Sequence, residues 1–380
     1  MGTLIFWKVE GGDMPVGKGS KMPVPRQREN SLLIQKGRSD LLKMGGRDLA
    51  GLNIRVRIEP LLRQGAHLYR EEEFGRAFEI FSRVLRIDFW NTSGLEGCGF
   101  CAHHMGLFAQ AQRFLRVLPN HLSGDGFRTS QGVEMVNLPG GSFRMGTDEE
   151  ELALAWEAEL INKSRENGWS LEETRRKPEG SQEVVRRRYA RHRVRLSPFC
   201  FAETCISNGQ FREFRTRYRA RIRDLRFDSS PACMSWEEAV AFCQWLSKRD
   251  GRLYRLPTEA EWEYVARIEG KGETAYSGRF GDLRSNVFQW CLDYYADDYY
   301  PRSPKLDPFG PDEGTSRVVR GGTASCRKDN VCTYPWGRQK SDLSVNELID
   351  GDEFLCRHVT GLRLVCACDR KPGFLEYGTG

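Results

Sequence analysis

Apolar positions between residues 60 and 122 repeat with a period of 34 residues. Self-similarity at this period is typical of stacked helix–turn–helix units, in which each unit buries its apolar face against the next. The segments Glu73–Leu85 and Leu107–Leu118 also carry apolar residues at helical spacing. We therefore predict a short α-helical repeat module over residues 60–122. The equivalent positions are Phe74 and Phe108, Ala77 and Ala111, Ile80 and Phe114, Phe81 and Leu115, and Val84 and Leu118.

This module resembles the tetratricopeptide repeat. Tyr69, Phe74, Ala77 and Phe81 occupy the positions at which such repeats place their packing residues. The resemblance covers roughly two repeats, and an array needs about three to stand alone. We therefore expect the module to lean on the domain that follows it. The resemblance also implies that the repeats recruit a protein partner.

Residues 1–59 show no comparable pattern. They are basic and Gly-rich with poor apolar periodicity, so we predict a disordered or weakly structured leader with Ser31–Leu42 as its only helix candidate. No run in the 380-residue chain approaches the ~18 apolar residues of a membrane-spanning helix, so we expect no membrane association. No signal-peptide core is evident at the N-terminus, which predicts a cytoplasmic location.

Charge and cysteine content narrow the function classes. The net charge of +6 is a mild excess and does not point to nucleic acid. The chain is too long to be a small disulfide scaffold. Its 12 cysteines are therefore candidates for core residues, metal ligands or nucleophiles.

From residue 133 onward the pattern changes to short strand-like runs separated by Gly and Pro. Two helices have clear start signals, because Ser235 with Glu238 and Thr258 with Glu261 each form a capping box. Residues 149–180 are highly charged and are predicted to form an inserted helical segment. The C-terminal dozen residues are expected to fray. The predicted strands are Glu134–Leu138, Gly141–Met145, His192–Leu196, Phe199–Phe201, Arg317–Arg320 and Gly361–Cys366.

Eight phrases in this half of the chain occur in a recognisable order. The most specific is Arg255-Leu-Pro-Thr-Glu-Ala-Glu-Trp-Glu263. The others are Leu138–Gly146, His192–Leu196, Ser207–Phe211, Met234–Ala239, Ser285–Trp290, Arg317–Gly322 and Gly361–Val365. Together they resemble the formylglycine-generating enzyme (sulfatase-modifying factor) family, and we place this domain at residues 133–370. The resemblance implies a C-type-lectin-related α+β fold, here preceded by the α-helical repeat module.

The resemblance also implies a catalytic site. Catalytic members of the family carry two cysteines after a Gly-Gly-Ser phrase, and the two thiolates bind Cu(I). Here Cys326 matches the first position, Thr323 keeps the hydroxyl, and Cys332 matches the second after a one-residue insertion. Thiolates are soft ligands that select Cu(I). The implied activity is the Cu(I)- and O₂-dependent oxidation of a peptidyl cysteine, in a sulfatase-type target, to formylglycine.

An alternative is a catalytically degenerate domain that binds a protein, peptide or glycan. Non-catalytic relatives often carry a core cysteine near the position of Cys332, and free cysteines are usually buried. The basic phrase that usually follows is replaced here, and Gln339–Val359 form an insertion in the loop expected to shape the substrate groove. The oxidase and the binding domain therefore both stay open.

A calcium site is a further hypothesis from the resemblance. Family members bind calcium through a stretch that corresponds to Ser285–Trp290, in which Asn286 and Gln289 are the candidate ligands. Gln289 replaces a carboxylate by an amide, which should weaken the affinity for Ca²⁺. A plain packing role for this stretch is equally open. A second calcium site, expected before Asn286, is deleted because the stretch from Arg267 is short.

Weaker signals occur elsewhere. Cys98 and Cys101 precede His103 and His104 inside the second repeat, where helix packing is favoured over zinc because no second Cys/His pair follows at zinc-finger spacing. Cys366 and Cys368 alternate on the last predicted strand, where alternate residues share a face, and they are expected to fill the core.

Two surface features complete the candidates. Arg212, Arg215, Arg219 and Arg223 recur at helical spacing and predict a basic stripe, by default a solvated face and otherwise a site for an acidic partner. The segment Asp297–Tyr300 interleaves aromatic and acidic residues and is expected to be exposed, as a recognition surface would be.

Overall fold

The computed structural model describes most of the chain from residue 49 onward. The described ranges are 49–118, 124–147, 152–153, 156–157, 160, 164, 167–177, 182–183, 186, 189–218, 227–269, 276, 278–280, 283, 287–321, 336–340, 359–368 and 372–377. Within these ranges no helix combines the length and apolar character needed to cross a bilayer. The predicted leader lies outside them, except that its last residues form the start of the first helix.

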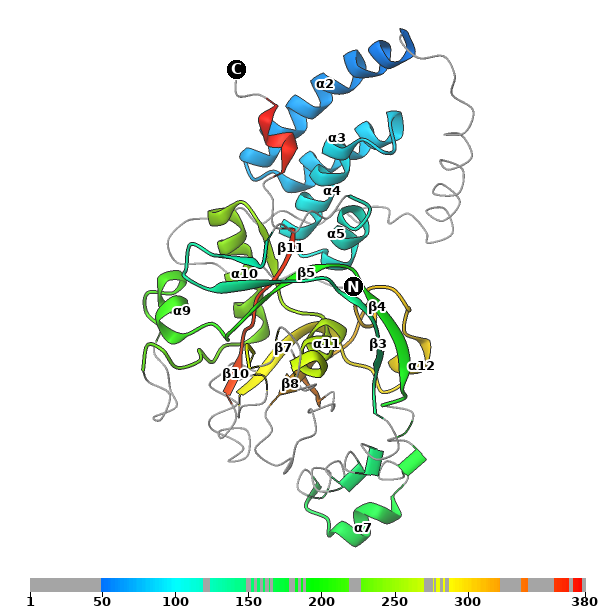
Figure 1. Cartoon of the computed structure of the whole chain (residues 1–380), viewed down its shortest axis with the longest axis vertical. Coiled ribbons are helices and arrows are strands. Elements are labelled where there is room, and N and C mark those ends of the chain that lie inside the picture. Colours follow the sequence, from blue (N-terminus) through cyan, green and yellow to red (C-terminus); the bar gives the residue numbers. More distant parts are fainter. Residues whose placement is uncertain are drawn as a thin grey trace.

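Four consecutive helices form the N-terminal module, as the repeat predicts (Figure 1). The first helix begins ahead of the predicted boundary at residue 60, because Ile58 and Leu62 continue its buried stripe. Each helix packs on the next one along the chain. Phe81, fully buried, lies at the centre of their shared core. The helices are α2 (Leu49–Arg70), α3 (Phe74–Ile87), α4 (Thr92–His104) and α5 (Phe108–Leu115).

A five-stranded sheet organises the second half of the chain. Its order is β1-β2-β5-β11-β6, and all its described pairings are antiparallel. The strands are β1 (Gly126–Arg128), β2 (Glu134–Leu138), β5 (Phe199–Ala202), β6 (Leu253–Arg255) and β11 (Val365–Cys368). The predicted strands at 134–138 and 199–201 are therefore confirmed.

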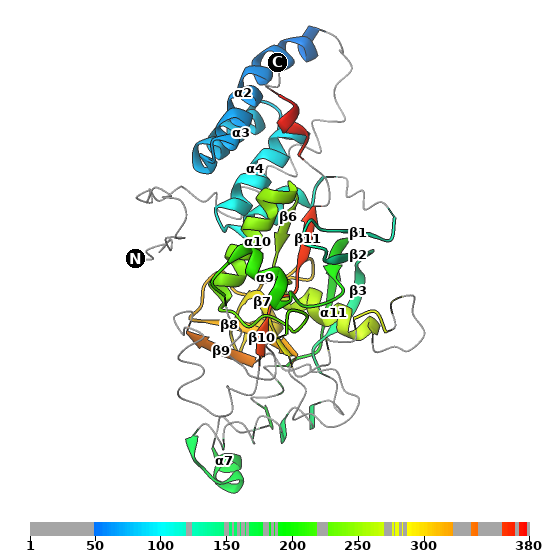
Figure 2. The ribbon, with the colours of Figure 1, turned by 90° about the vertical axis from the view of Figure 1, so that its left-hand side faces the viewer.

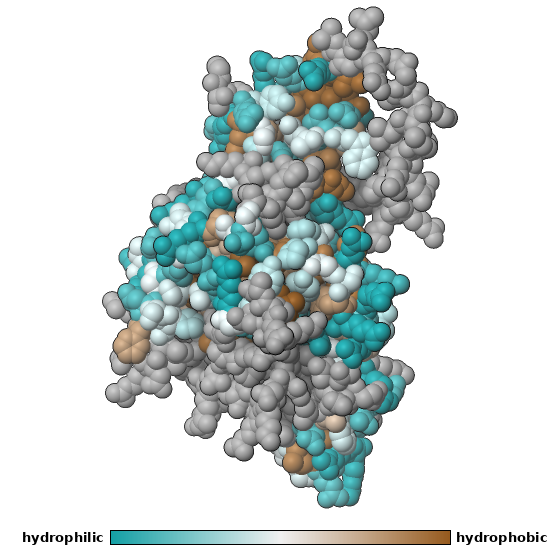
Figure 3. All heavy atoms as spheres, viewed as in Figure 1, coloured by the Kyte–Doolittle hydropathy of each residue, from teal (hydrophilic) through white to brown (hydrophobic). Residues whose placement is uncertain are grey.

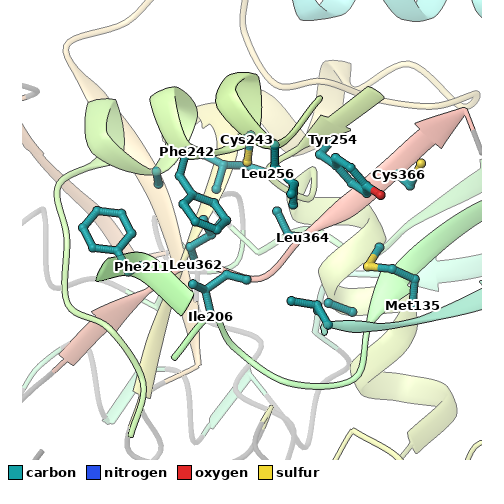
Figure 4. Packing of buried hydrophobic residues seen from close by; sticks show 14 of the residues in the cluster. Met135, Ile206, Phe211, Phe242, Cys243, Tyr254, Leu256, Leu362, Leu364 and Cys366 are labelled. Carbon is teal, nitrogen blue, oxygen red and sulfur yellow. The ribbon is translucent and has the colours of Figure 1, made fainter. Parts of the chain in front are cut away.

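Both faces of this sheet are buried, which explains why its strands read as apolar runs rather than alternating ones. Residues Met135 and Cys200 face one core cluster, together with Phe242 of α10 (Trp236–Asp250); Figure 4 shows this packing from close by. The adjacent residues Val136 and Phe201 face the opposite cluster, with α11 (Glu259–Glu269) above it. The sheet is thus held between two helices.

Both helices start where the sequence predicts. Ser235 Oγ accepts a hydrogen bond from the Glu238 amide, and the Glu238 carboxylate accepts one from the Ser235 amide. Thr258 and Glu261 make the same reciprocal pair at the start of α11. Each capping box satisfies amide groups that the first helical turn leaves without partners.

A second, four-stranded sheet has the order β10-β7-β8-β9. Its strands are β7 (Val287–Tyr294), β8 (Ser316–Gly321), β9 (Trp336–Lys340) and β10 (Val359–Gly361), and only the β10–β7 pairing among them is parallel. A separate hairpin-like pair consists of β3 (Gly141–Met145) and β4 (His192–Leu196). The result is a mixed α+β domain preceded by a helical module, as expected.

The predicted strand at 361–366 is wrong in one respect. The chain belongs to the four-stranded sheet up to Gly361 and to the five-stranded sheet from Val365. Between them the carbonyl groups of Leu362 and Leu364 accept hydrogen bonds from Ile206 and Ala202. The buried side chain of Arg363 lies at this crossing, which a periodicity argument treats as one continuous strand.

Three short helices lie at the periphery: α7 (Leu171–Arg176), α9 (Asn208–Phe214) and α12 (Tyr299–Arg302). Helix α7 lies within the predicted inserted helical segment, far from the helical module in Figure 1.

The two predicted surface features need correction. Helix α9 ends before Arg215, so the predicted arginines do not share one helix; Arg212 pairs with Asp228 and Arg215 with Glu238. Arg219 and Arg223 lie outside the described residues. The expected exposure of Asp297–Tyr300 is also wrong in part, because Tyr299 and Tyr300 are buried.

Within the C-terminal dozen residues predicted to fray, the described residues 372–377 are ordered instead. Residues Gly373–Glu376 form a 3₁₀ turn, η7, that packs on α2 and α4 of the helical module; the two perpendicular views agree on this (Figures 1 and 2). Phe374 is fully buried there. The chain therefore returns from the sheet-bearing domain to the module, and the contacts of α5 with β11 show that the module packs against that domain, as expected.

Candidate functional site

The candidate catalytic residues Thr323, Cys326 and Cys332 all lie in the connection from β8 to β9, outside the described residues. Both ends of that connection are described. The two strands are antiparallel neighbours, with Val319 opposite Trp336. The chain therefore leaves β8 and enters β9 at the same end of the sheet, and the segment that carries both cysteines connects these two points.

Gly321 fixes the exit from β8. Its φ of +90° lies in the region that favours glycine, and a Cβ placed there would come within 2.7 Å of the Val287 carbonyl oxygen on the neighbouring strand. A larger residue would push β8 away from β7 at this point. Thus glycine is required two residues before Thr323.

Arg320, next to this exit, is the anchor of a buried charge cluster. Its side chain is fully buried, and its Nη2 donates to Glu263 Oε2 at 2.8 Å while its Nη1 donates to Glu259 Oε1 at 3.3 Å. The guanidinium also lies over the Trp262 ring, 5.0 Å from its centroid. A buried guanidinium needs such paired partners because desolvation of an unpaired charge is costly.

The two carboxylates come from one helix. Glu259 and Glu263 are four residues apart on α11 and so share a face. Glu259 also accepts a hydrogen bond from the Tyr300 hydroxyl at 2.9 Å, and Glu263 from Arg267 Nε at 2.8 Å. Burial raises the pKa of Glu259 to about 7, although the charge of Arg320 opposes that rise.

A second ion pair supports the start of the same helix. Arg255 donates from both terminal nitrogens to the Glu261 carboxylate, at 2.7 Å each. Asp293 of β7 accepts a hydrogen bond from the Glu259 amide at 2.9 Å and so caps α11 from outside the helix. Burial, reinforced by the charge of Glu259, raises the pKa of Asp293 well above its usual value.

The comparisons with known proteins identify this domain. Residues 125–280 match the family model described as "Sulfatase-modifying factor enzyme 1-like domain". Residues 125–280 are therefore similar to a sulfatase-modifying factor domain, and we call this domain by that name. The formylglycine-generating enzyme of Streptomyces coelicolor is 32% identical over 141 residues, which cover 26% of this chain and 43% of that protein. The chain thus spans less than half of that relative's length.

Two further matches differ in extent. The Bos taurus protein named "Inactive C-alpha-formylglycine-generating enzyme 2" is 27% identical over 219 residues, covering 48% of this chain and 65% of that protein. The solved structure of PvdO from Pseudomonas aeruginosa covers 64% of this chain and 98% of its own, with 18% identity and a TM-score of 0.38.

Gln289, a candidate calcium ligand of the sulfatase-modifying factor domain, is fully buried in β7. Its Oε1 accepts hydrogen bonds from Trp262 Nε1 at 2.9 Å and from Arg363 Nε at 3.0 Å. Arg363 donates onward to the Ala202 carbonyl at 2.8 Å and so links both sheets. The partner candidate, Asn286, lies outside the described residues, and the calcium hypothesis stays a prediction.

The described part of the domain forms a frame of buried ion pairs and hydrogen bonds around the exit from β8. Glu259, Glu263 and Arg320 are buried, so they have no open path to a substrate for proton transfer. Among the described residues, no group of three or more His, Cys, Asp and Glu side chains is arranged to hold a metal. The frame positions three elements that meet at β8: helix α11, strand β7 and the chain entering Thr323.

Glu259 and Glu263 lie in the most specific phrase of the family resemblance, but the sequence pattern alone assigned them no role. Two signals could have identified them. Carboxylates four residues apart on the buried side of an amphipathic helix require a cation. Arg320 supplies it from a strand that otherwise reads as buried, between Val319 and Gly321.

The cysteines of the helical module behave as packing residues. Cys98 and Cys101 are buried in α4, and Cys98 Sγ lies 3.7 Å from Ser82 Oγ. Burial raises the pKa of the Cys98 thiol to about 12, which disfavours the thiolate that metals and electrophiles require. Cys366 is likewise buried, on β11.

Proposed function

We propose that the sulfatase-modifying factor domain oxidises a peptidyl cysteine to formylglycine, with Cys326 and Cys332 as ligands of Cu(I). The observation that supports this is the pairing of Val319 with Trp336, which brings the two ends of the cysteine-bearing connection to the same end of the sheet. The donor set fits the ion, because two thiolates are soft ligands suited to Cu(I). Bound Cu(I) would supply the redox chemistry with O₂.

The chain's own residues would position this site. The ion pairs of Arg320 with Glu259 and Glu263 hold the end of β8, and the conformation of Gly321 directs the chain into Thr323. Arg327 and Lys328 follow Cys326 directly in the sequence. Their positive charges would favour the thiolate forms that a metal requires.

The reaction must balance in electrons. Conversion of –CH₂–SH to –CHO with release of H₂S removes two electrons from the peptide, whereas reduction of O₂ to water consumes four. Two further electrons and two protons must therefore come from a thiol reductant. A single turnover converts R–CH₂–SH, O₂, two electrons and two protons into R–CHO, H₂S and one water, so the net products hold one oxygen atom in the aldehyde and one in the water. The expected substrate is a peptide with the sulfatase-type segment Cys-x-Pro-x-Arg.

A Cu(I) titration tests the site without a substrate. The reduced full-length chain is titrated against a tight competing chelator. We expect one tightly bound copper in the wild type and in the control Cys233→Ser, which removes a partly buried cysteine of the described domain. Cys326→Ser and Cys332→Ser should each lose it. Unchanged copper binding in both variants would contradict the proposal.

A catalytically degenerate binding domain is the second candidate. The Bos taurus relative named as inactive matches 219 residues, a longer stretch than the 141 residues matched by the Streptomyces coelicolor enzyme. Under this proposal the same surface would bind a protein, peptide or glycan. Incubation of the copper-loaded chain with the Cys-x-Pro-x-Arg peptide, O₂ and a thiol separates the two, because only the oxidase yields an aldehyde by mass spectrometry.

A further inference from the structure

The C-terminal segment formed by residues 372–377, here called the strap, is held by the helical module mainly through its main chain. The Gly373 amide donates to Glu96 Oε2 at 2.8 Å. Arg70 Nη2 donates to the carbonyl oxygens of Leu375 at 2.5 Å and Tyr377 at 2.9 Å. These three bonds use main-chain groups of the strap and no side chain of it.

One side chain anchors the strap. Phe374 is fully buried, and its ring centroid lies 4.8 Å from that of Phe81, 5.0 Å from Tyr69 and 5.9 Å from Phe100. These three aromatic residues come from α3, α2 and α4, so the module supplies the aromatic lining of the pocket. Aromatic pairs at such distances are favourable beyond the area that they bury.

Two glycines shape this pocket. A Cβ at Gly97 would lie 2.3 Å from the Phe81 ring, and one at Gly65 would lie 2.8 Å from it. Helices α2 and α4 therefore approach Phe81 closely from both sides and fix the ring that Phe374 contacts.

The strap also carries a specificity element. A Cβ at Gly373 would lie 3.3 Å from Glu96 Oε2, which is tight, so the position before the anchor favours glycine. Glu96 is itself buried, with 3% of its surface exposed, and the Gly373 amide supplies one of the hydrogen bonds that a buried carboxylate needs. Leu375, in contrast, is only partly buried.

We propose that the helical module is a peptide-binding module for extended segments that carry a Gly-Phe pair, and that the chain's own strap occupies the site in cis. The partner is an unstructured segment of another protein, recognised by one phenylalanine in the aromatic pocket and by its main chain on Arg70 and Glu96. A tethered strap competes at an effective concentration on the order of mM. This binding site does not depend on the copper proposal.

Peptide exchange in the full-length chain tests this proposal. Phe374→Ala removes the anchor of the strap but leaves the receptor side chains intact. We expect a fluorescent peptide with the sequence of residues 370–380 to bind this variant at least tenfold more tightly than the wild type, by fluorescence anisotropy. The same peptide with alanine in place of its phenylalanine should not bind, and alanine in place of its first glycine should weaken binding. Equal, negligible binding to a folded Phe374→Ala chain and to the wild type would overturn the proposal.

A second variant covers the case in which Phe374→Ala does not fold. A specific protease site inserted between Arg370 and Lys371 leaves every contact of the strap unchanged until cleavage. After cleavage we expect the released strap to exchange for the labelled peptide in excess, while the helical signal in circular dichroism is retained. Unfolding of the module on cleavage, or a strap that an excess of peptide cannot replace, would show a structural staple and overturn the proposal.

Discussion

The helical module and the sulfatase-modifying factor domain bury polar side chains in opposite ways. In the module, His103 is buried and His104 is partly buried, close to the contact with the domain, where Gln244 Nε2 donates to the His104 carbonyl. His103 Nε2 and His104 Nδ1 have no hydrogen-bond partner among the described residues. In the domain, Arg320 is buried against Glu259 and Glu263 in two ion pairs. Burial thus favours the neutral form of these two histidines, whereas the domain buries a charged arginine between carboxylates.

This difference predicts how each region fails. A histidine that is buried in its neutral form destabilises the fold when acid protonates it. A buried charge in an ion pair destabilises the fold when a single substitution removes its partner. The domain should thus be sensitive to substitution at one residue, and the module to pH.

The largest expected effect is that of Arg320→Met. Glu259 and Glu263 would remain buried without their shared cation, and removal of one partner from a buried ion pair typically costs about 3–5 kcal/mol. We expect the domain to lose most of its stability, measured by chemical denaturation of the full chain. Hydrogen exchange of α11 shows whether the loss begins there.

Arg302→Ala is the matched control. It removes an exposed i,i+4 pair with Asp298, and such surface pairs contribute about 0–1 kcal/mol. Similar losses in both variants would mean that the buried cluster is not the weak point of the domain. A triple variant with Glu259→Gln, Glu263→Gln and Arg320→Met should regain part of the lost stability, because no charge is left unpaired.

The parts predicted correctly from the sequence depend on local or periodic signals. The capping boxes at Ser235 and Thr258 form as predicted because both hydrogen bonds span only three residues. The helical module follows from its repeat. The docking of Phe374 could not be predicted, because one aromatic residue in an irregular tail has no periodicity and its partners lie about 300 residues earlier, at Tyr69 and Phe81.

The candidate site was predictable only in part for a related reason. Arg320 and Arg363 act through contacts between elements far apart in the chain, whereas strand patterns describe one element at a time. Arg363 in particular sits where one predicted strand divides between two sheets. Cys326, Cys332 and Thr323 stay predictions, because their evidence is the match to a family phrase.

The second largest expected effect is the loss of stability of the helical module at acid pH. Burial, with the positive charge of Lys248, lowers the pKa of His104 to about 3, and burial, His104 and Arg255 lower that of His103 well below its usual value. The unfolded chain binds these protons near pH 6.5, so stability falls as the pH drops below that value. At pH 5 His104 alone should cost about 2 kcal/mol.

The domain should respond in the opposite direction. The pKa of Glu259 is raised to about 7, so the folded domain binds this proton more readily than the unfolded chain does between about pH 7 and 4.5. We therefore expect hydrogen exchange at pH 5, corrected for intrinsic rates, to speed up in α4 but not in α11. His104→Gln should remove only part of the effect in α4, because His103 remains; equal acceleration in both helices would contradict the comparison.

The smallest effect expected concerns two glycines of the module. Gly97→Ala would place a Cβ 2.3 Å from the buried Phe81 ring, and overpacking of this kind costs about 1–3 kcal/mol. Gly75→Ala is the matched control near the start of α3, because nothing lies within 4 Å of its added Cβ and alanine favours a helix. In thermal unfolding, the midpoint temperature should fall for Gly97→Ala and rise for Gly75→Ala.

Because Phe81 contacts Phe374, Gly97→Ala should also weaken binding of the 370–380 peptide in a Phe374→Ala background, whereas Gly75→Ala should not. A Gly97→Ala chain that loses stability but binds the peptide unchanged would show that the Phe81 ring serves the module's core without shaping the pocket.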